Sequence, residues 1–212
     1  TTKFVPSTEY KTEEDYLRLV KTSLHNLQTS YIDLFLLHWP GVYGASKKDI
    51  VKYRHEAWNA LSKFKKEGLI RSIGVSNFLI RHLEEMREAC EEVPALNQVE
   101  WHPMCFDLKL LEYCNENKIL LQAYSSLGTS SDRSLKNHKL IKEIAAKNGQ
   151  STSRILLKWA NIRRVAIIPK ASSSSHLLEN INLDFELTTE DMKLLDELND
   201  SERFDWNPND IV

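Results

Sequence analysis

Polar side chains that can bind or orient a ligand recur where the apolar runs of this sequence end. His38 ends the run LFLLH and Lys170 ends the run VAIIPK, so one end carries an imidazole and another an ammonium. Hydroxyl, amide, carboxylate and phenol groups lie at the other ends, at Ser76, Asn77, Gln98, Glu100, Tyr124 and Ser125. A single strand often finishes on a polar residue for structural reasons, but five successive polar ends indicate a shared polar site.

His38 and the tryptophan beside it favour a pocket that receives a substrate oxygen. A partly buried imidazole tends to stay neutral, because burial disfavours its charged form, and it can then donate one hydrogen bond to that oxygen. Trp39 would supply an apolar wall. The alternative is a structural histidine whose ring nitrogens are satisfied by neighbouring backbone groups.

The other strand ends suit a flat, polar and anionic ligand. The amides of Asn77 and Gln98 both donate and accept, which suits recognition of a carboxamide, although loop capping would use them equally well. The ring of Tyr124 can stack on a heteroaromatic group, or pack only as an amphipathic side chain. Lys170 and the following ASSSSH place a cation and hydroxyls before a predicted helix, whose first N–H groups favour a phosphate.

Apolar runs that alternate with amphipathic stretches position these groups. We predict strands at residues 31–38, 69–77, 95–100, 119–125 and 165–170, and helices at 12–27, 54–68, 80–90, 107–118, 138–149, 151–160, 174–182 and 188–199. Strands that alternate with helices run parallel, in an open doubly wound sheet or a closed (β/α) barrel. The six glycines form no GxGxxG motif, which favours the barrel, with the strand ends at one mouth.

Composition restricts the class of protein. The 212 residues carry 28 Lys and Arg against 30 Asp and Glu, a balance that predicts a globular protein and argues against a polyanion binder. We expect a cytoplasmic protein with free thiols, because no apolar run could span a membrane, no signal-peptide pattern opens the chain and the three cysteines form no CxxC. HPMC at 102–105 has no second ligand pair close by, so no metal is expected.

Five motifs carry a resemblance to a known family. LFLLHWP, GLIRSIGVSNF, NQVEWHP, QAYSSLG and IIPK with LLENI, in that order and at these distances, closely resemble the aldo-keto reductase family between Thr1 and Glu190. The resemblance implies a (β/α)8 TIM barrel, expected here as a single domain over residues 1–212 that is incomplete at its N-terminus, without the first two strand-helix units. It also implies reduction of aldehydes and ketones to alcohols by hydride transfer from NADPH, bound without a Rossmann motif.

The resemblance implies a role for each strand end. His38 would orient the substrate carbonyl, and Lys3 would lower the pKa of a tyrosine acid that in the family lies, with its aspartate, upstream of this lysine. Trp39 would line the substrate pocket. The residues expected to hold the nicotinamide are Ser76, Asn77, Gln98 and Tyr124, those beside the pyrophosphate are Ser125 and Leu127, and those around the adenosine and its 2′-phosphate are Lys170, Ser173, His176, Glu179 and Asn180.

Three departures from the family pattern concern the cofactor. Ser126 replaces a usual proline and the loop at 129–136 is short, so we expect looser enclosure and faster release of the cofactor. His176 stands where many NADPH-specific members have arginine. Without that permanent cation we expect NADPH or NADP+ to be preferred through Lys170, with NADH tolerated.

Two other functions stay open. The chain could be a catalytically silent relative that binds nucleotide or a partner, since neither the tyrosine nor the aspartate can be assigned. It could also be a different barrel enzyme that uses His38 as a general base without nicotinamide. For the reductase, the expected partner is a small-molecule carbonyl substrate, and neither nucleic acid nor a membrane is expected as a partner. The full-length protein is expected to be a monomer.

Overall fold

The structure is a computed structural model that describes residues 1–5, 7, 9–10, 12–42, 45–129 and 135–211. The chain divides into two compact units, which are described separately. The first unit is Thr1–Gln98, Lys109–Leu120 and Asn207–Val212, and the second is Val99–Leu108 and Leu121–Trp206. Most of the loop predicted at 129–136 lies outside the described residues.

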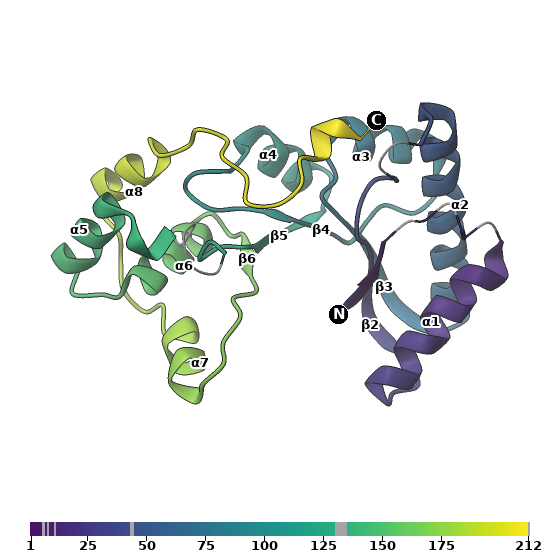
Figure 1. Ribbon diagram of the computed structural model, residues 1–212, viewed down its shortest axis with the longest axis horizontal. Helices are drawn as coiled ribbons and strands as arrows, with labels where there is room; N and C mark the ends of the chain where they lie inside the picture. Colours follow the sequence, from purple (N-terminus) through teal and green to yellow (C-terminus); the bar gives the residue numbers. More distant parts are fainter. Residues whose placement is uncertain (6, 8, 11, 43–44, 130–134, 212) are drawn as a thin grey trace. The chain divides into compact units, whose positions relative to one another are not determined.

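Parallel strands form the centre of each unit (Figure 1). The strands are β1 Thr2–Phe4, β2 Ile32–Leu37, β3 Ile70–Ser76, β4 Leu96–Glu100, β5 Leu120–Tyr124 and β6 Ala166–Ile167. In the first unit β1, β2, β3 and β4 lie in chain order with parallel pairing, and in the second β5 pairs in parallel with β6. Parallel strands in chain order characterise a (β/α) barrel, whereas a doubly wound sheet reorders them, so the predicted fold class is confirmed.

Helices separate consecutive strands along the chain, and two more follow the last strand. They are α1 Glu13–Leu27, α2 Lys47–Lys66, α3 Ile80–Ala89, α4 Leu108–Glu116, α5 Lys139–Lys147, α6 Thr152–Ile162, α7 Ser174–Ile181 and α8 Thr189–Asp196, with short 3-10 helices η2 Leu135–Asn137 and η3 Pro208–Asp210. Figure 1 shows α1 and α2 beside one another in the first unit, and α5, α6 and α8 gathered in the second. Within the described residues, no helix is both long and apolar enough to cross a membrane.

Capping residues explain where the helices begin. Thr12 forms a capping box with Asp15, as the threonine and the acids after it predict. For α2 the prediction was wrong by seven residues, because the helix begins at Lys47 and not at Arg54. Ser46 is its N-cap and accepts the backbone N–H of Asp49 at 3.2 Å. A buried charge at Arg54 interrupts the apolar stripe of α2 and conceals its period.

Each unit has its own hydrophobic core. In the first, Phe35, Leu36 and Leu37 of β2, Trp58 of α2 and Ile73 of β3 are fully buried, and β3 packs against both β2 and α2. Gly74 permits this packing, since a Cβ there would lie 2.7 Å from the Leu96 carbonyl oxygen. In the second unit Trp101, Phe106 and Trp159 form an aromatic cluster with ring centroids 5.1–6.2 Å apart.

Candidate active site

The register of the sheet brings the C-terminal ends of the first strands level with one another. Phe4 of β1 lies opposite Leu37 of β2, and Leu37 lies opposite Val75 of β3. The backbone N–H of His38 donates to the carbonyl of Phe4 at 2.9 Å, which fixes the backbone where the histidine leaves the strand. Parallel pairing therefore places the polar strand ends of the first unit at one edge, as the sequence predicts.

Gln98 is the centre of the polar group at this edge. The Lys3 ammonium donates to its side-chain oxygen, and the Ser76 hydroxyl donates to its backbone carbonyl at 2.7 Å. The backbone N–H of Asn77 donates to the same carbonyl at 2.9 Å. Ser76, Asn77 and Gln98 are at most 3% exposed. The structure thus brings together four residues that the sequence assigned to one site, although they come from three different strands and the turn after one of them.

Asn77 joins this group to the histidine. Its side-chain amide donates to the His38 carbonyl at 3.0 Å and lies 3.3 Å from the Ser76 hydroxyl oxygen. Its φ of 64° lies in the left-handed region, which asparagine tolerates better than most residues. The amide of Asn77 therefore braces the end of β2 from the end of β3. Its expected contact with a nicotinamide stays a prediction.

Trp39 lies deeper than a simple pocket wall. It is 5% exposed and packs with Ile50, Ile211 and Ala45. The His38 ring stacks on it with centroids 6.4 Å apart and planes inclined by 26°. The half-buried imidazole is thus supported on one face by an indole that is itself held from α2 and from the C-terminal segment.

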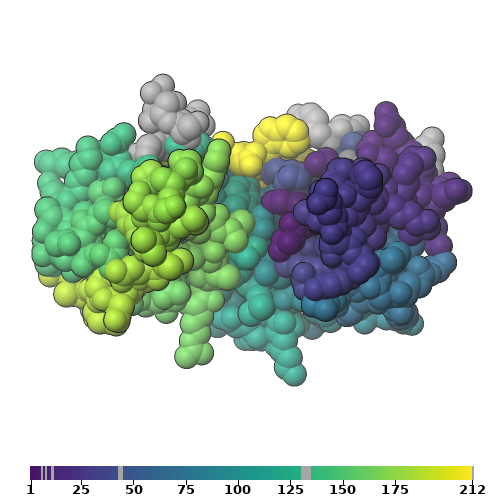
Figure 2. All heavy atoms as spheres, turned by 90° about the horizontal axis from the view of Figure 1, so that it is seen from below, coloured from purple at the N-terminus to yellow at the C-terminus, as the bar shows by residue number. Residues whose placement is uncertain are grey.

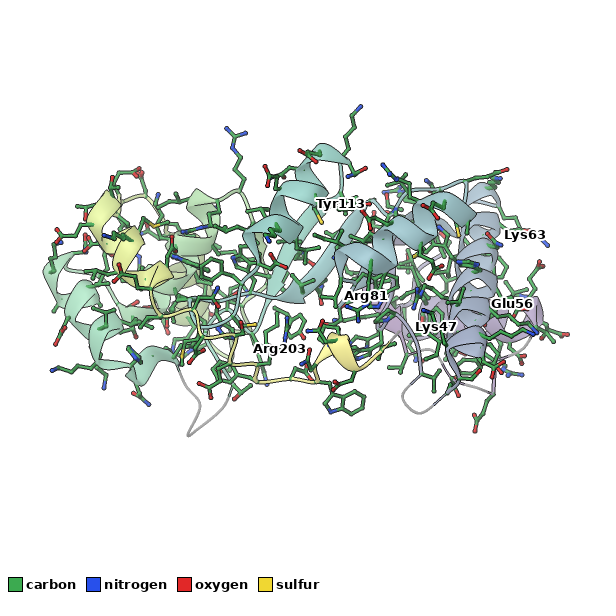
Figure 3. All side chains as sticks on the ribbon, turned by 90° about the horizontal axis from the view of Figure 1, so that it is seen from above. Lys47, Glu56, Lys63, Arg81, Tyr113 and Arg203 are labelled. Atoms are coloured by element: carbon green, nitrogen blue, oxygen red, sulfur yellow. The ribbon has the colours of Figure 1, made fainter. Side chains whose placement is uncertain are left out.

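The C-terminal segment is attached to α3 next to this site. The Arg81 guanidinium donates to the carbonyl of Ile211 at 2.9 Å and to the carbonyls of Pro208 and Asn209 (Figure 3). His82 accepts the Leu79 backbone N–H at Nδ1, so its proton is on Nε2, which donates to Ile211 at 3.1 Å. Burial, and then the charges of Arg54 and Arg81, lower the pKa of His82 to about 3.

The remaining predicted residues belong to the second unit. Tyr124 ends β5, and burial, followed by the carboxylates of Asp205 and Glu100, raises the pKa of its phenol, which therefore stays neutral. Ser125 has a φ of 52° and its carbonyl accepts the N–H of Gly128 at 2.8 Å, which turns the chain after the strand. Leu127 lies within this turn.

The predicted phosphate site lies at the start of α7. Ser173 is the N-cap, and its hydroxyl accepts the His176 backbone N–H at 3.2 Å. Lys170, Ser173 and His176 are exposed, Glu179 is half-buried and Asn180 is buried. Figure 2 shows α7, in lime green, at the surface of the second unit. An exposed cation before a helix N-terminus is the donor set that an anion requires, so the arrangement fits the expected phosphate.

Among the buried charged residues are Arg54, to which the sequence assigned no role, and Glu100, which was predicted only as one of the polar strand ends. Arg54 lies on the inner side of α2, and Glu100 ends β4. Glu100 accepts the Phe204 backbone N–H at 2.6 Å and His102 Nε2 at 3.1 Å. Burial by itself would raise the pKa of Glu100, but these hydrogen bonds outweigh it and lower the pKa. The sequence marked Glu100 only as a strand end, and Arg54 only as a charge within an apolar stripe.

Comparisons with known proteins identify the family. The sequence matches the model of the aldo/keto reductase family over residues 1–200. A glyoxal reductase of Bacillus subtilis (strain 168) is 38% identical over 99% of this chain and 73% of its own length. A 9,11-endoperoxide prostaglandin H2 reductase of Trypanosoma cruzi (strain CL Brener) is 36% identical over 93% of this chain and 67% of its own length.

A solved structure supports the same assignment. MGS-M4, an aldo-keto reductase enzyme from a Medee basin deep-sea metagenome library, has a TM-score of 0.85 at 30% identity and covers 97% of this chain and 74% of its own. This chain therefore belongs to the aldo/keto reductase family, whose members are oxidoreductases. The resemblance carried by the five motifs is confirmed.

Proposed function

We propose that this protein reduces aldehydes and ketones to alcohols with NADPH, as a single domain of the aldo-keto reductase barrel type. The observation that carries the proposal is the hydrogen-bonded group of Lys3, His38, Ser76, Asn77 and Gln98 at the level ends of β1 to β4. Family membership supports the reaction class, and the residue types at these strand ends support the roles below.

The histidine and the lysine meet the electrostatic requirement of the reaction. Bound NADPH would supply a hydride to the carbonyl carbon, and the carbonyl oxygen, left with negative charge, would take its proton from the tyrosine acid that in the family precedes Lys3. The His38 imidazole orients that oxygen by donating a hydrogen bond to it. The Lys3 ammonium favours negative charge nearby, and it lowers the pKa of the tyrosine acid that in the family precedes this lysine.

The cofactor-binding roles divide between buried amides and exposed charges. Ser76, Asn77 and Gln98 hold the nicotinamide carboxamide, because their amide and hydroxyl groups match its donors and acceptor. Tyr124 stacks on the nicotinamide ring, with Ser125 and Leu127 beside the pyrophosphate. The adenosine 2′-phosphate is held at the start of α7, by Lys170, Ser173, His176, Glu179 and Asn180. The exposed Lys170 cation supports NADPH over NADH, and His176, which stands where many NADPH-specific members have arginine, leaves NADH tolerated.

The proposed setting is a cytoplasmic monomer that acts on small aldehydes. The named activity of the Bacillus subtilis glyoxal reductase supports a small carbonyl substrate. All three cysteines are free, and Cys105 and Cys114 are buried, which supports a reducing compartment.

Two measurements on the full-length protein, the species for which turnover is expected, test the proposal. We expect NADPH to quench tryptophan fluorescence, and glyoxal to accelerate loss of the nicotinamide absorbance. Binding without turnover would support the catalytically silent relative. Turnover of a substrate without any nucleotide effect would support the barrel enzyme in which His38 acts alone, and would overturn the reductase.

A further inference from the structure

Arg54 is a buried charge on a helix face that otherwise packs in the core. It is 2% exposed, and it lies between Ile50 and Ala57 on the inner side of α2. An unpaired charge in such surroundings would be strongly destabilising. The Arg54 guanidinium pairs with Glu85 of α3, and Glu85 also contacts the His55 ring. The ion pair explains how the buried charge is tolerated. It does not explain why an arginine is there, because a leucine would fill the same space and need no ion pair.

The second contact of Arg54 reaches the catalytic turn. Its Nε donates to the Pro40 carbonyl at 2.6 Å, and Pro40 comes two residues after His38. A hydrogen bond from a charged donor is shorter and stronger than one between neutral groups. The planar guanidinium therefore holds the turn that follows the histidine, while its other side is fixed by Glu85.

The third contact reaches the turn after β3. The guanidinium carbon of Arg54 lies 5.8 Å from the Phe78 ring centroid, and Phe78 follows Asn77. The Asn97 side chain fixes Phe78, because it donates to the Phe78 carbonyl at 2.8 Å and accepts the Phe78 N–H at 3.4 Å. Asn77 in turn donates to the His38 carbonyl. Arg54 thus contacts both turns, through the Pro40 carbonyl and the Phe78 ring, and the Asn77 amide links the two turns to each other.

We propose that Arg54 is a positioning residue that sets the His38–Pro40 turn against the Ser76–Phe78 turn, and thereby aims the His38 imidazole and the Asn77 amide. Arg54 itself acts through the Pro40 carbonyl and the Phe78 ring, without touching the reacting atoms. The effect on turnover rests on the proposed function, whereas the effect on the two turns does not. A displacement of a reacting group by about 1 Å can lower a rate by about a hundredfold, so a brace of this kind has a measurable role.

Two variants separate positioning from charge and stability. Arg54→Lys keeps the charge beside Glu85 but loses the planar fork that reaches both Glu85 and Pro40. The double variant Arg54→Met with Glu85→Gln leaves no unpaired buried charge and keeps a partner for His55. Arg71→Met is the matched control, because the Arg71 side chain is 61% exposed and pairs with Asp33 at the surface.

Amide hydrogen exchange and kinetics give the two readouts. We expect faster exchange of the His38 and Asn77 amides in both Arg54 variants, and kcat lower by roughly tenfold or more with KM for the aldehyde within about twofold. Arg71→Met should match the parent in both measurements. Melting curves show whether each variant folds, and Arg54→Lys should melt close to the parent without recovering kcat.

Either readout can overturn the inference. Recovery of parental exchange and kcat in Arg54→Lys would show that charge alone is required. Parental exchange at His38 and Asn77 in the double variant would show that the contacts to Pro40 and Phe78 position nothing. A parent that does not turn over glyoxal would overturn the proposed function, while the exchange measurement would still decide the role of Arg54.

Discussion

The site residues of the first unit and those of the second differ in how they are held. Lys3, Ser76, Asn77 and Gln98 bond to one another, and the last three are buried. The residues at the start of α7 are mostly exposed, and there the Ser173 hydroxyl contacts Ser175 and the backbone of α7 itself. A buried polar group must find a partner in the fold, whereas an exposed one is satisfied by water. The difference agrees with the roles proposed above, which are chemistry for the residues of the first unit and retention of a charged group for those of the second.

The largest effect that this comparison predicts follows loss of the half-buried Lys3. In Lys3→Met we expect turnover of glyoxal with NADPH to fall by about two to four powers of ten, because positive charge at the reacting oxygen is lost. NADPH affinity, measured by fluorescence quenching, should change far less. Lys21→Met, an exposed substitution on α1, is the control. Parental kcat in Lys3→Met would remove Lys3 from the catalytic group.

The next effect is a pH dependence of stability in the first unit. The pKa of His82 is about 3 in the folded protein, against 6.5 for an unperturbed histidine such as that of the unfolded chain. As pH drops from 6.5 toward 3 the unfolded chain therefore binds a proton at this histidine while the folded protein does not, and stability falls. The expected slope from this group is up to about 1.4 kcal/mol per pH unit. Urea unfolding of His82→Gln should show a shallower slope, and the exposed His25→Gln the parental one. Equal slopes of stability against pH in the parent and both variants would contradict the assignment of His82 as a buried neutral histidine.

A smaller effect is expected at the turn after β3. Asn77→Ala loses the bond to the His38 carbonyl and places a Cβ without a polar group at a φ of 64°, so we expect a loss of about 1.5 kcal/mol in the free energy of unfolding. Asn77→Gly loses the same bond but tolerates the φ. If the glycine variant is as unstable as the alanine variant, the left-handed backbone conformation contributes nothing to the loss of unfolding free energy in Asn77→Ala.

The smallest effect is expected at the exposed residues that precede α7. In Lys170→Met we expect KM for NADPH to rise by roughly tenfold and KM for NADH to stay unchanged, because a cation that contacts the 2′-phosphate is lost. Added salt should reduce the difference between parent and variant, since exposed charges are screened. Lys142→Met, an exposed change on α5, is the control. Equal NADPH kinetics in Lys170→Met and parent would place the phosphate elsewhere.

Local sequence signals predicted most of the elements and failed at identifiable places. Caps such as Thr12 and Thr188 mark helix starts, because the cap bond joins residues three apart. The prediction failed at the start of α2, where Arg54 interrupts the apolar period, and at β6, which is shorter than the apolar run 165–170. At α2 the ion pair of Arg54 with Glu85 of α3 overrides the local pattern.

By itself, the sequence determined which residue types end the strands, and therefore which role each residue can be proposed to have. The alternation of apolar runs and polar ends is local, and parallel strands bring like ends together. Only the tertiary structure decided which atoms meet: the Asn77 amide and the His38 carbonyl are 39 residues apart, and Arg54 and Glu85 are 31 apart. A charge within an apolar stripe shows in the sequence only as an irregularity. Its partners belong to other elements, and the packing of those elements determines whether it disturbs the core or braces the active site.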